Sequence, residues 1–377
     1  MEHLRSEVIL LFENWWRNEN AQALFGYQYP KRNRVPEPLR RAWMPPGDFD
    51  GNWAGMPWLF GHLLDGGDYA EIDALLEVIA LQQSEERFLG CGFPRVFPNC
   101  GPGCLSAFSS GFVLANKGDI WYELGTHQPG FELEEIPSLD ESRGRKIIEI
   151  ITEIMQRSNR RSVGKIPVSM TDLGGNLDTL AALRGAQDLL MDLVDEPDMV
   201  HESLEKLDAQ WLRWYASFDQ MISESSSSCR GAWMQILSEK PFYPLQCDFG
   251  ALISPEMFNE FVRPSLQRIG AGLGRAVFHL DGPAMQGHLP YVFEVPEVHG
   301  VQWTPGAGKP DVHDECWFEL YRTIIEGGRK VILLCFPPDA EALKRLFRAL
   351  PAKEFYIHVE GPDRETGEAL QRLVDKQ

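Results

Sequence analysis

Short apolar runs alternate with amphipathic stretches along most of the chain, and this alternation predicts repeated strand–helix units. Apolar residues recur at helical spacing over 69–88, where Ile72, Leu75, Leu76 and Ile79 mark one face. The other predicted helices cover residues 139–158, 178–193, 198–222, 254–270, 314–326, 339–349 and 364–375. The short apolar runs predict strands at residues 93–97, 166–170, 231–236, 275–280, 299–304, 330–335 and 354–359.

Strands that alternate with helices in this way are typical of a parallel sheet. About eight such units, with polar residues at most strand ends, favour an α/β fold of the closed (β/α)8 TIM barrel type over an open sheet. A dinucleotide-binding fold would need Gly-x-Gly-x-x-Gly after an early strand, and Gly101-Pro102-Gly103 does not match that pattern. A Walker A sequence is also absent.

The first 65 residues lack this regular alternation and are rich in proline, glycine and tryptophan. We therefore expect residues 1–65 to form an N-terminal extension that packs on the barrel through aromatic side chains. The barrel itself would cover residues 66–377. The turn signal Asn116-Lys117-Gly118 predicts a hairpin insertion in this barrel near residues 105–135.

Composition narrows the classes of function further. The formal net charge of −19 argues against a nucleic-acid surface, which needs Lys and Arg, and gives no attraction to anionic lipid. The N-terminus lacks the pattern of a signal peptide, and no apolar run approaches the ~18 residues of a membrane span. The seven cysteines form no Cys-x-x-Cys pair, which fits reduced thiols. We expect a cytoplasmic protein that binds a small molecule.

Candidate chemistry lies where the predicted strands end. His279 and Asp281 follow the apolar run 276–278, and the alternation of a strand points both side chains to one face. Similar polar ends occur at Gln246-Cys247-Asp248, at Gln302-Trp303-Thr304-Pro305 and at His358-Val359-Glu360-Gly361. Polar groups at the carboxyl ends of barrel strands are typical of an active site.

Further polar and aromatic residues are candidates for binding a substrate. Asp172 and Asn176 flank a Gly-Gly turn and either cap the following helix or bind substrate at the barrel mouth. Cys100, at another strand end, either faces the pocket or is a buried thiol. The aromatic and polar candidates for pocket walls, each with core packing as the alternative, are Trp233, Tyr243, Trp303, Gln246 and His358.

Four segments carry a resemblance to a known family: residues 170–176, 246–258, 279–282 and 302–308. Over about residues 90–375, the chain resembles the uroporphyrinogen decarboxylase superfamily. The resemblance implies a (β/α)8 barrel. It does not fix the reaction, because the superfamily contains both decarboxylases and corrinoid-linked methyltransferases.

The two branches differ in their motifs. The decarboxylases carry an arginine-rich RQAGR motif that binds the acidic arms of a tetrapyrrole, and this chain has no such motif. The methyltransferases hold zinc with His-x-Cys and a later Cys. Here the matching positions are His279 and Asp281, and the late position falls near Glu360. The resemblance thus implies a zinc site of His279, Asp281 and Glu360, with Cys335 as an alternative ligand.

Three functions follow from these residues. The first is a methyltransferase that activates a small-molecule methyl donor through zinc or an acid. It would pass the methyl group to a corrinoid on a separate partner protein, because Asp-x-His-x-x-Gly is absent here. The second is a metal-independent decarboxylase that uses Asp248, Asp172 or Asp281, since histidine–carboxylate pairs also serve as acids and bases. The third is a non-catalytic barrel that binds a ligand.

Overall fold

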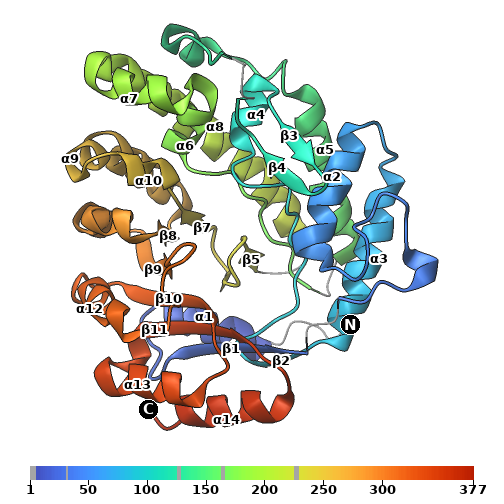
Figure 1. Ribbon diagram of the computed structural model, residues 1–377, viewed down its shortest axis with the longest axis vertical. Coiled ribbons are helices and arrows are strands. Elements are labelled where there is room, and N and C mark those ends of the chain that lie inside the picture. Colours follow the sequence, from blue (N-terminus) through green and yellow to red (C-terminus); the bar gives the residue numbers. More distant parts are fainter. Residues whose placement is uncertain (1–5, 31–32, 125–128, 163–165, 225–228) are drawn as a thin grey trace.

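A central, mainly parallel sheet organises the fold (Figure 1). The computed structural model describes residues 6–30, 33–124, 129–162, 166–224 and 229–377. The sheet has seven strands in the order β2-β1-β11-β10-β9-β8-β7. These strands are β1 (Leu24–Tyr29), β2 (Arg87–Gly90), β7 (Tyr243–Leu245), β8 (Ala276–Asp281), β9 (Val298–Thr304), β10 (Lys330–Phe336) and β11 (Phe355–Glu360).

Neighbouring strands from β1 to β7 pair in parallel, and only β2 runs antiparallel, against β1. Parallel pairing requires a crossover between successive strands, and helices supply it on the outer side of the sheet (Figure 1). The strands β9, β10 and β11 are buried along nearly their whole length, as expected for strands covered on both faces. The crossover helices are α9 (Pro255–Met257), α10 (Arg263–Leu273), α11 (Leu289–Phe293), α12 (Phe318–Glu326) and α13 (Ala340–Ala349), and α14 (Arg364–Val374) follows the last strand.

The N-terminal segment contributes a strand to this sheet, which the sequence did not predict. Within the predicted extension, β1 lies between β11 and β2, with Gly26 opposite His358. Its first helix, α1, packs near β6, a short strand that lies far away in the sequence. The extension contains α1 (Ser6–Trp16) and α2 (Met56–Leu64), and α3 (Ala70–Glu85) follows it.

The middle of the chain is mainly helical. The predicted hairpin is present as β3 (Leu114–Asn116) paired with β4 (Asp119–Trp121), and a second small hairpin joins β5 (Arg230–Gly231) to β6 (Leu237–Ser238). The helices here are α4 (Leu105–Ser110), α5 (Arg145–Ser162), α6 (Asn176–Arg184), α7 (Ala186–Asp195) and α8 (Pro197–Glu224).

The predicted closed barrel of eight strands is not formed by the described residues. The predicted strands at 93–97, 166–170 and 231–236 are reduced to isolated parallel bridges, Val96 with Val168 and Ser169 with Gly231. Pro94 and Pro167 lack the N–H that a continuous ladder would need. The sheet therefore remains open between β7 and β2.

Two of the predicted helices are divided in the structure, and the one predicted at 254–270 consists of α9 and α10 with a π-helical turn, Phe258–Val262, between them. The single helix predicted at 178–193 is two helices, α6 and α7, separated by Gly185. Gly185 has φ +98°, a conformation outside the helical region that favours glycine. The helix predicted to start at Ser254 does so, because the Ser254 hydroxyl accepts a hydrogen bond from the Met257 N–H at 3.2 Å. No helix of the described chain is long and apolar enough to cross a membrane.

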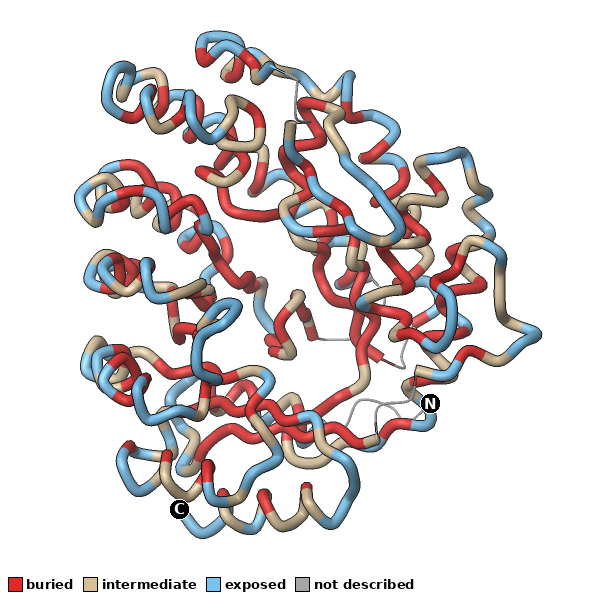
Figure 2. Tube along the Cα trace, viewed as in Figure 1, coloured by how far each residue is buried: buried red, intermediate tan, exposed pale blue. Residues whose placement is uncertain are grey.

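Burial follows this arrangement, with the sheet and the inner helix faces buried and the outer helix faces exposed (Figure 2). A buried ion pair fixes α1 to this core. The Arg275 guanidinium donates to both oxygens of Glu13, at 2.6 and 2.8 Å, and lies 5.3 Å from the Trp16 ring. The Glu13 carboxylate also accepts a hydrogen bond from the Glu239 N–H at 2.9 Å.

We expect Glu13→Ala to destabilise the protein by about 3–5 kcal/mol, because it leaves a buried guanidinium without its anion. Burial raises the pKa of Glu13, but the hydrogen bonds from Arg275 and Glu239 outweigh it and leave the pKa lowered. The contribution is therefore present above the ordinary carboxyl pKa and is lost as pH falls through the lowered value. Urea unfolding at several pH values measures both effects.

The control for this experiment is the exposed pair Arg364–Glu368 on α14. Glu368→Ala should leave the urea midpoint nearly unchanged, since exposed pairs contribute little. An equal loss of folding stability in Glu13→Ala and Glu368→Ala would contradict the conclusion that the buried ion pair of Glu13 stabilises the fold.

Candidate functional site

The candidate site lies at the carboxyl edge of the parallel sheet. Because β8 and β9 pair in register, His279 stands opposite Gln302 and Asp281 stands opposite Thr304. Asp248 follows β7, the neighbour of β8, and opens a short 3-10 turn over Asp248–Leu252. The carboxyl ends of parallel strands meet at one edge, so these residues from three neighbouring strands are brought together.

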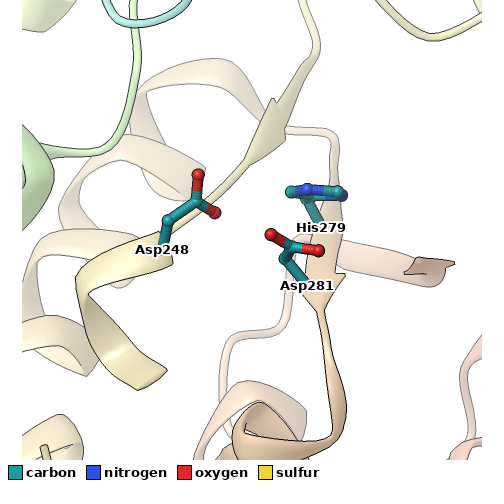
Figure 3. Close-up of side chains that lie close together, drawn as sticks. All are labelled: Asp248, His279 and Asp281. Carbon is teal, nitrogen blue, oxygen red and sulfur yellow. The ribbon is translucent and has the colours of Figure 1, made fainter. Parts of the chain in front are cut away.

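Three side chains converge at this edge: Asp248, His279 and Asp281 (Figure 3). One ligand atom from each lies within 4.8 Å of the others. His279 and Asp281 are half-buried, and Asp248 is the exposed member. The strand ends directly after this group, because Gly282 has φ +81° and Pro283 follows it.

Gln302 orients the histidine. The His279 Nδ1 and Gln302 Oε1 atoms lie 2.5 Å apart. The Gln302 amide nitrogen is already committed, donating to the Trp303 carbonyl at 2.8 Å and to the Thr304 hydroxyl at 2.9 Å. The amide oxygen can only accept, so His279 carries its proton on Nδ1 and keeps a lone pair on Nε2. A partner of this kind commonly holds a metal-binding or catalytic histidine in place.

Carboxyl groups crowd the site and raise one another's pKa. Asp248 is exposed as a residue, but the surrounding protein partly desolvates its carboxyl group and raises its pKa, the nearby Asp281 carboxylate adds to the rise, and His279 opposes it. Burial and the charge of Asp248 raise the pKa of Asp178 to about 7. Asp178 also fixes the turn at Asp248, accepting hydrogen bonds from the Asp248 N–H at 3.1 Å and the Phe249 N–H at 2.8 Å. Like charges held this close favour the binding of a proton or a cation.

A cleft of about 710 Å³ lies behind residues that contact His279, although Asp248, His279 and Asp281 do not line it themselves. Gln302 and Trp233 line this cleft and also touch His279, the indole ring standing 5.1 Å from the imidazole at 90°. Trp303 and His358 line it as well, so three of the predicted pocket residues are placed on its wall. A cleft of this size suits a small organic molecule.

Two predicted residues lie on the cleft but outside the converging group. Glu360 and Cys335 line the cleft, yet the third group beside His279 and Asp281 is Asp248. Glu360 ends β11, which is separated from β8 by β9 and β10. Neighbouring strands lie about 4.8 Å apart, so Glu360 is three strand spacings from His279 and Asp281 and does not reach them. Cys335 has φ +58° at an irregularity of β10.

The remaining predicted residues are engaged inside the protein. Tyr243 is buried, donating from its hydroxyl to Asp172 at 2.9 Å and accepting from the Leu173 N–H at 2.7 Å. The Asn176 amide donates to Asp208 and, at 3.3 Å, to Ser265, behind the turn.

Asp172 closes its own turn by accepting from the Gly174 N–H at 2.8 Å, and burial raises its pKa. Cys100 is fully buried, and burial raises the pKa of its thiol to about 12, which makes it a poor nucleophile. Gln246 is buried beside a smaller hollow of about 450 Å³, which Asp178 and Asp248 also line.

Two residues of the site, Asp178 and Arg95, had no role in the sequence prediction, and Gln302 was named only as part of a polar strand end. Arg95 is 5% exposed and lines the cleft. The position of Gln302 at a strand end was the one available signal for it. Nothing in the sequence around Asp178 or Arg95 pointed to the site.

The converging group offers one nitrogen and two carboxylate oxygens. Three protein ligands with room for a fourth are the usual donor set of catalytic zinc, and nitrogen and oxygen ligands fit that ion. The crowding of negative charge at Asp248 and Asp281 also fits a cation. The residues present therefore fit a divalent metal.

Comparison with known proteins finds a similar fold but no similar sequence. No protein-family model matches the sequence, and no curated protein matches it. Among solved structures the chain is similar to a methyltransferase from Methanosarcina mazei, with a TM-score of 0.57 over 99% of each chain. The two sequences are 10% identical.

The chain shares the fold of a methyltransferase. The similarity extends over the whole length, so it includes β1 and the N-terminal helices as well as the strands around the site. At 10% identity it concerns the fold alone.

The hydrogen bond to Gln302 gives a prediction for the histidine proton. We expect ¹⁵N NMR to find the neutral His279 ring protonated on Nδ1, because Gln302 Oε1 accepts that proton. His288 is an internal control of opposite kind, since its Nε2 lies 2.9 Å from the Gly250 carbonyl and must donate to it. In Gln302→Met, His279 should shift towards a mixture of tautomers while His288 is unchanged. An Nε2-protonated His279 in the wild type would contradict this assignment.

Proposed function

We propose that this protein is a methyltransferase of the corrinoid-linked type, which activates a small-molecule methyl donor at the carboxyl edge of its sheet. The observation that carries the proposal is the convergence of Asp248, His279 and Asp281 beside a 710 Å³ cleft. The fold shared with a methyltransferase and the resemblance of the strand-end segments to the uroporphyrinogen decarboxylase superfamily support it.

The proposed metal ligands are His279, through Nε2, and the carboxylates of Asp248 and Asp281. Zinc bound there would act as a Lewis acid towards the heteroatom that carries the methyl group. Oxygen ligands donate less charge than thiolates, so this site would suit an ether, hydroxyl or amine donor. The methyl group would pass to a corrinoid on a separate partner protein.

The chain's own residues would position the reactants. Gln302 keeps the lone pair of His279 on Nε2, and the hydrogen bonds that Asp178 accepts hold the turn that carries Asp248. Trp233 packs edge-on against the imidazole and restricts its ring. Fixed placement of this kind can supply a large part of a rate enhancement.

A metal-independent decarboxylase is the second candidate, and one observation favours it. The raised pKa values of Asp248 and Asp172 allow a carboxyl group to hold a proton at this edge of the sheet, which a protonated pyrrole-like intermediate would require. The lack of the RQAGR motif argues against a tetrapyrrole with many acidic arms.

Metal analysis tests the proposed ligands. We expect about one zinc per chain after reconstitution, because three converging ligands match a catalytic zinc site. His279→Ala and Asp281→Asn should each abolish binding, whereas Glu360→Gln should retain the metal. Loss in Glu360→Gln with retention in Asp248→Asn would instead support Glu360 as the third ligand. No metal in the reconstituted wild type would remove zinc from the proposal.

Methyl transfer can be measured with free cob(I)alamin as acceptor and a panel of methyl ethers and methylamines as donors. We expect His279→Ala to lower the rate by at least about 100-fold, in the range that positioned catalytic groups contribute. Removing metal with a chelator should abolish transfer. Release of carbon dioxide from a pyrrole carboxylate, unaffected by the chelator, would favour the decarboxylase.

A further inference from the structure

The cleft contains a buried cation that the proposed chemistry does not use. Arg95 is 5% exposed, and no carboxylate of the described residues forms an ion pair with its guanidinium within 4 Å, although the charges of Asp50 and Glu360 act on it from farther away. Buried charges in proteins are ordinarily paired, since an unpaired one loses its hydration without compensation. Burial lowers the pKa of Arg95 to about 10, so it remains charged at neutral pH.

The surroundings hold this guanidinium in a fixed orientation. Its Nη1 donates to the Ala232 carbonyl at 2.8 Å and to the Met234 carbonyl at 2.9 Å. The rings of Trp53 and Phe97 lie 5.9 and 5.5 Å from its Cζ atom. Within the described part of the chain the Arg95 side chain donates hydrogen bonds through Nη1 alone, so the rest of its donor fork is available to a ligand.

Two tryptophans that line the same cleft, Trp233 and Trp303, also carry a donor without a partner. The indole Nε1 atoms of Trp233 and Trp303 are buried, and neither has a hydrogen-bond partner in the described part of the chain. Trp303 is wholly buried. Buried donors without partners are uncommon in proteins and call for an explanation, and a bound ligand with acceptor oxygens is one.

We propose that this cleft binds a small carboxylate, with Arg95 receiving the carboxylate group and the Trp233 and Trp303 N–H groups available to further acceptor atoms. A planar carboxylate matches the guanidinium fork. The wall also carries Glu360 and Asp311, with Lys309 as the other cation, so its fixed charges suit one negative charge better than two. That balance favours a carboxylate over a phosphate dianion.

The proposal rests on the proposed function in one respect, since it names the substrate class for that site. Gln302 and Trp233 both line the cleft and contact His279. A methyl donor anchored by its carboxylate at Arg95 would lie along this shared wall, with its other end towards Asp248, His279 and Asp281. The substrate class is then a methyl ether or methylamine that bears a carboxylate.

Isothermal titration of the metal-free full chain tests the binding directly. The probes are benzoate, 4-methoxybenzoate and methoxyacetate, each compared with its neutral alcohol counterpart. We expect at least one carboxylate to bind to a single site, roughly tenfold or more tighter than its alcohol, because a charge-assisted hydrogen bond is lost in the alcohol. Equal affinity within every pair, or no saturable binding of any carboxylate, would overturn the proposal.

Variants place the site in the molecule. Arg95→Gln should weaken carboxylate binding and leave the alcohols unaffected, whereas Trp303→Phe should weaken the binding of 4-methoxybenzoate and methoxyacetate together with that of their alcohols, because the methoxy oxygen loses its donor. Trp15→Phe is the matched control, because Trp15 is also wholly buried with no partner for its Nε1 among described residues, but it does not line the cleft. If Arg95→Gln does not fold, the ligand affinities of Trp303→Phe and Trp233→Phe test whether the ligand lies in this cleft. Wild-type carboxylate affinity in folded cleft variants would overturn the assignment.

The same titration separates this proposal from the proposed function. Carboxylate binding without metal and without corrinoid does not depend on methyl transfer, and His279→Ala should retain it. Zinc binding and methyl transfer from neutral donors, with no preference for carboxylates, would leave the methyltransferase standing and refute the carboxylate site. Carboxylate binding without any methyl transfer would support the carboxylate site and refute the methyltransferase.

Discussion

The parallel pairing of β8 with β9 is the constraint on which the site depends. It sets His279 opposite Gln302 and Asp281 opposite Thr304, and alternation along β8 keeps the histidine and the aspartate on one face. The same pairing places the Gln302 amide where its two N–H groups are consumed by Trp303 and Thr304, so that its oxygen is left for His279. A slip of one residue in this register would turn the set to the other face and remove the site as a unit.

The carboxyl groups around Asp248 are held at a cost to folding stability. Asp172, Asp178 and Asp281 each lie near enough to interact with it, and the pKa values of Asp172, Asp178 and Asp248 are raised. A chain with a net charge of −19 gains nothing for its fold from gathering acids at one edge. Such an arrangement is typical of sites where a cation or a proton is bound during function, because the ligand relieves the repulsion.

The sequence predicted the strands that are buried on both faces, because such strands appear in the sequence as uninterrupted apolar runs. Strands β8 to β11 each contain a run of apolar residues, and their predicted ranges agree with the observed ones within one residue at each end. The pattern failed for β1, which contains glycine and glutamine and lies in a segment rich in proline, and for the bridges at Val96 and Val168, where prolines interrupt the ladder. For the site, alternation along the strand was enough to pair His279 with Asp281.

Asp248, the third side chain of the site, could be placed beside them only from the order of strands in the sheet, which puts β7 rather than β11 next to β8. Arg95 had no motif around it, and only its burial without a carboxylate partner shows that it is unusual.

The cleft and the converging group have different electrostatic characters but share a wall. Arg95 and two unpartnered indole N–H groups make the cleft a site of donors, whereas Asp248 and Asp281 make the strand edge a site of acceptors. Trp233 and Gln302 stand between them and touch His279. A ligand with an acceptor group at one end and a reacting heteroatom at the other can satisfy both, while a reversed orientation would set its anion against two carboxylates. The charge pattern therefore selects one orientation before any chemistry occurs, and a reaction that depends on in-line transfer of a single carbon gains most from such selection.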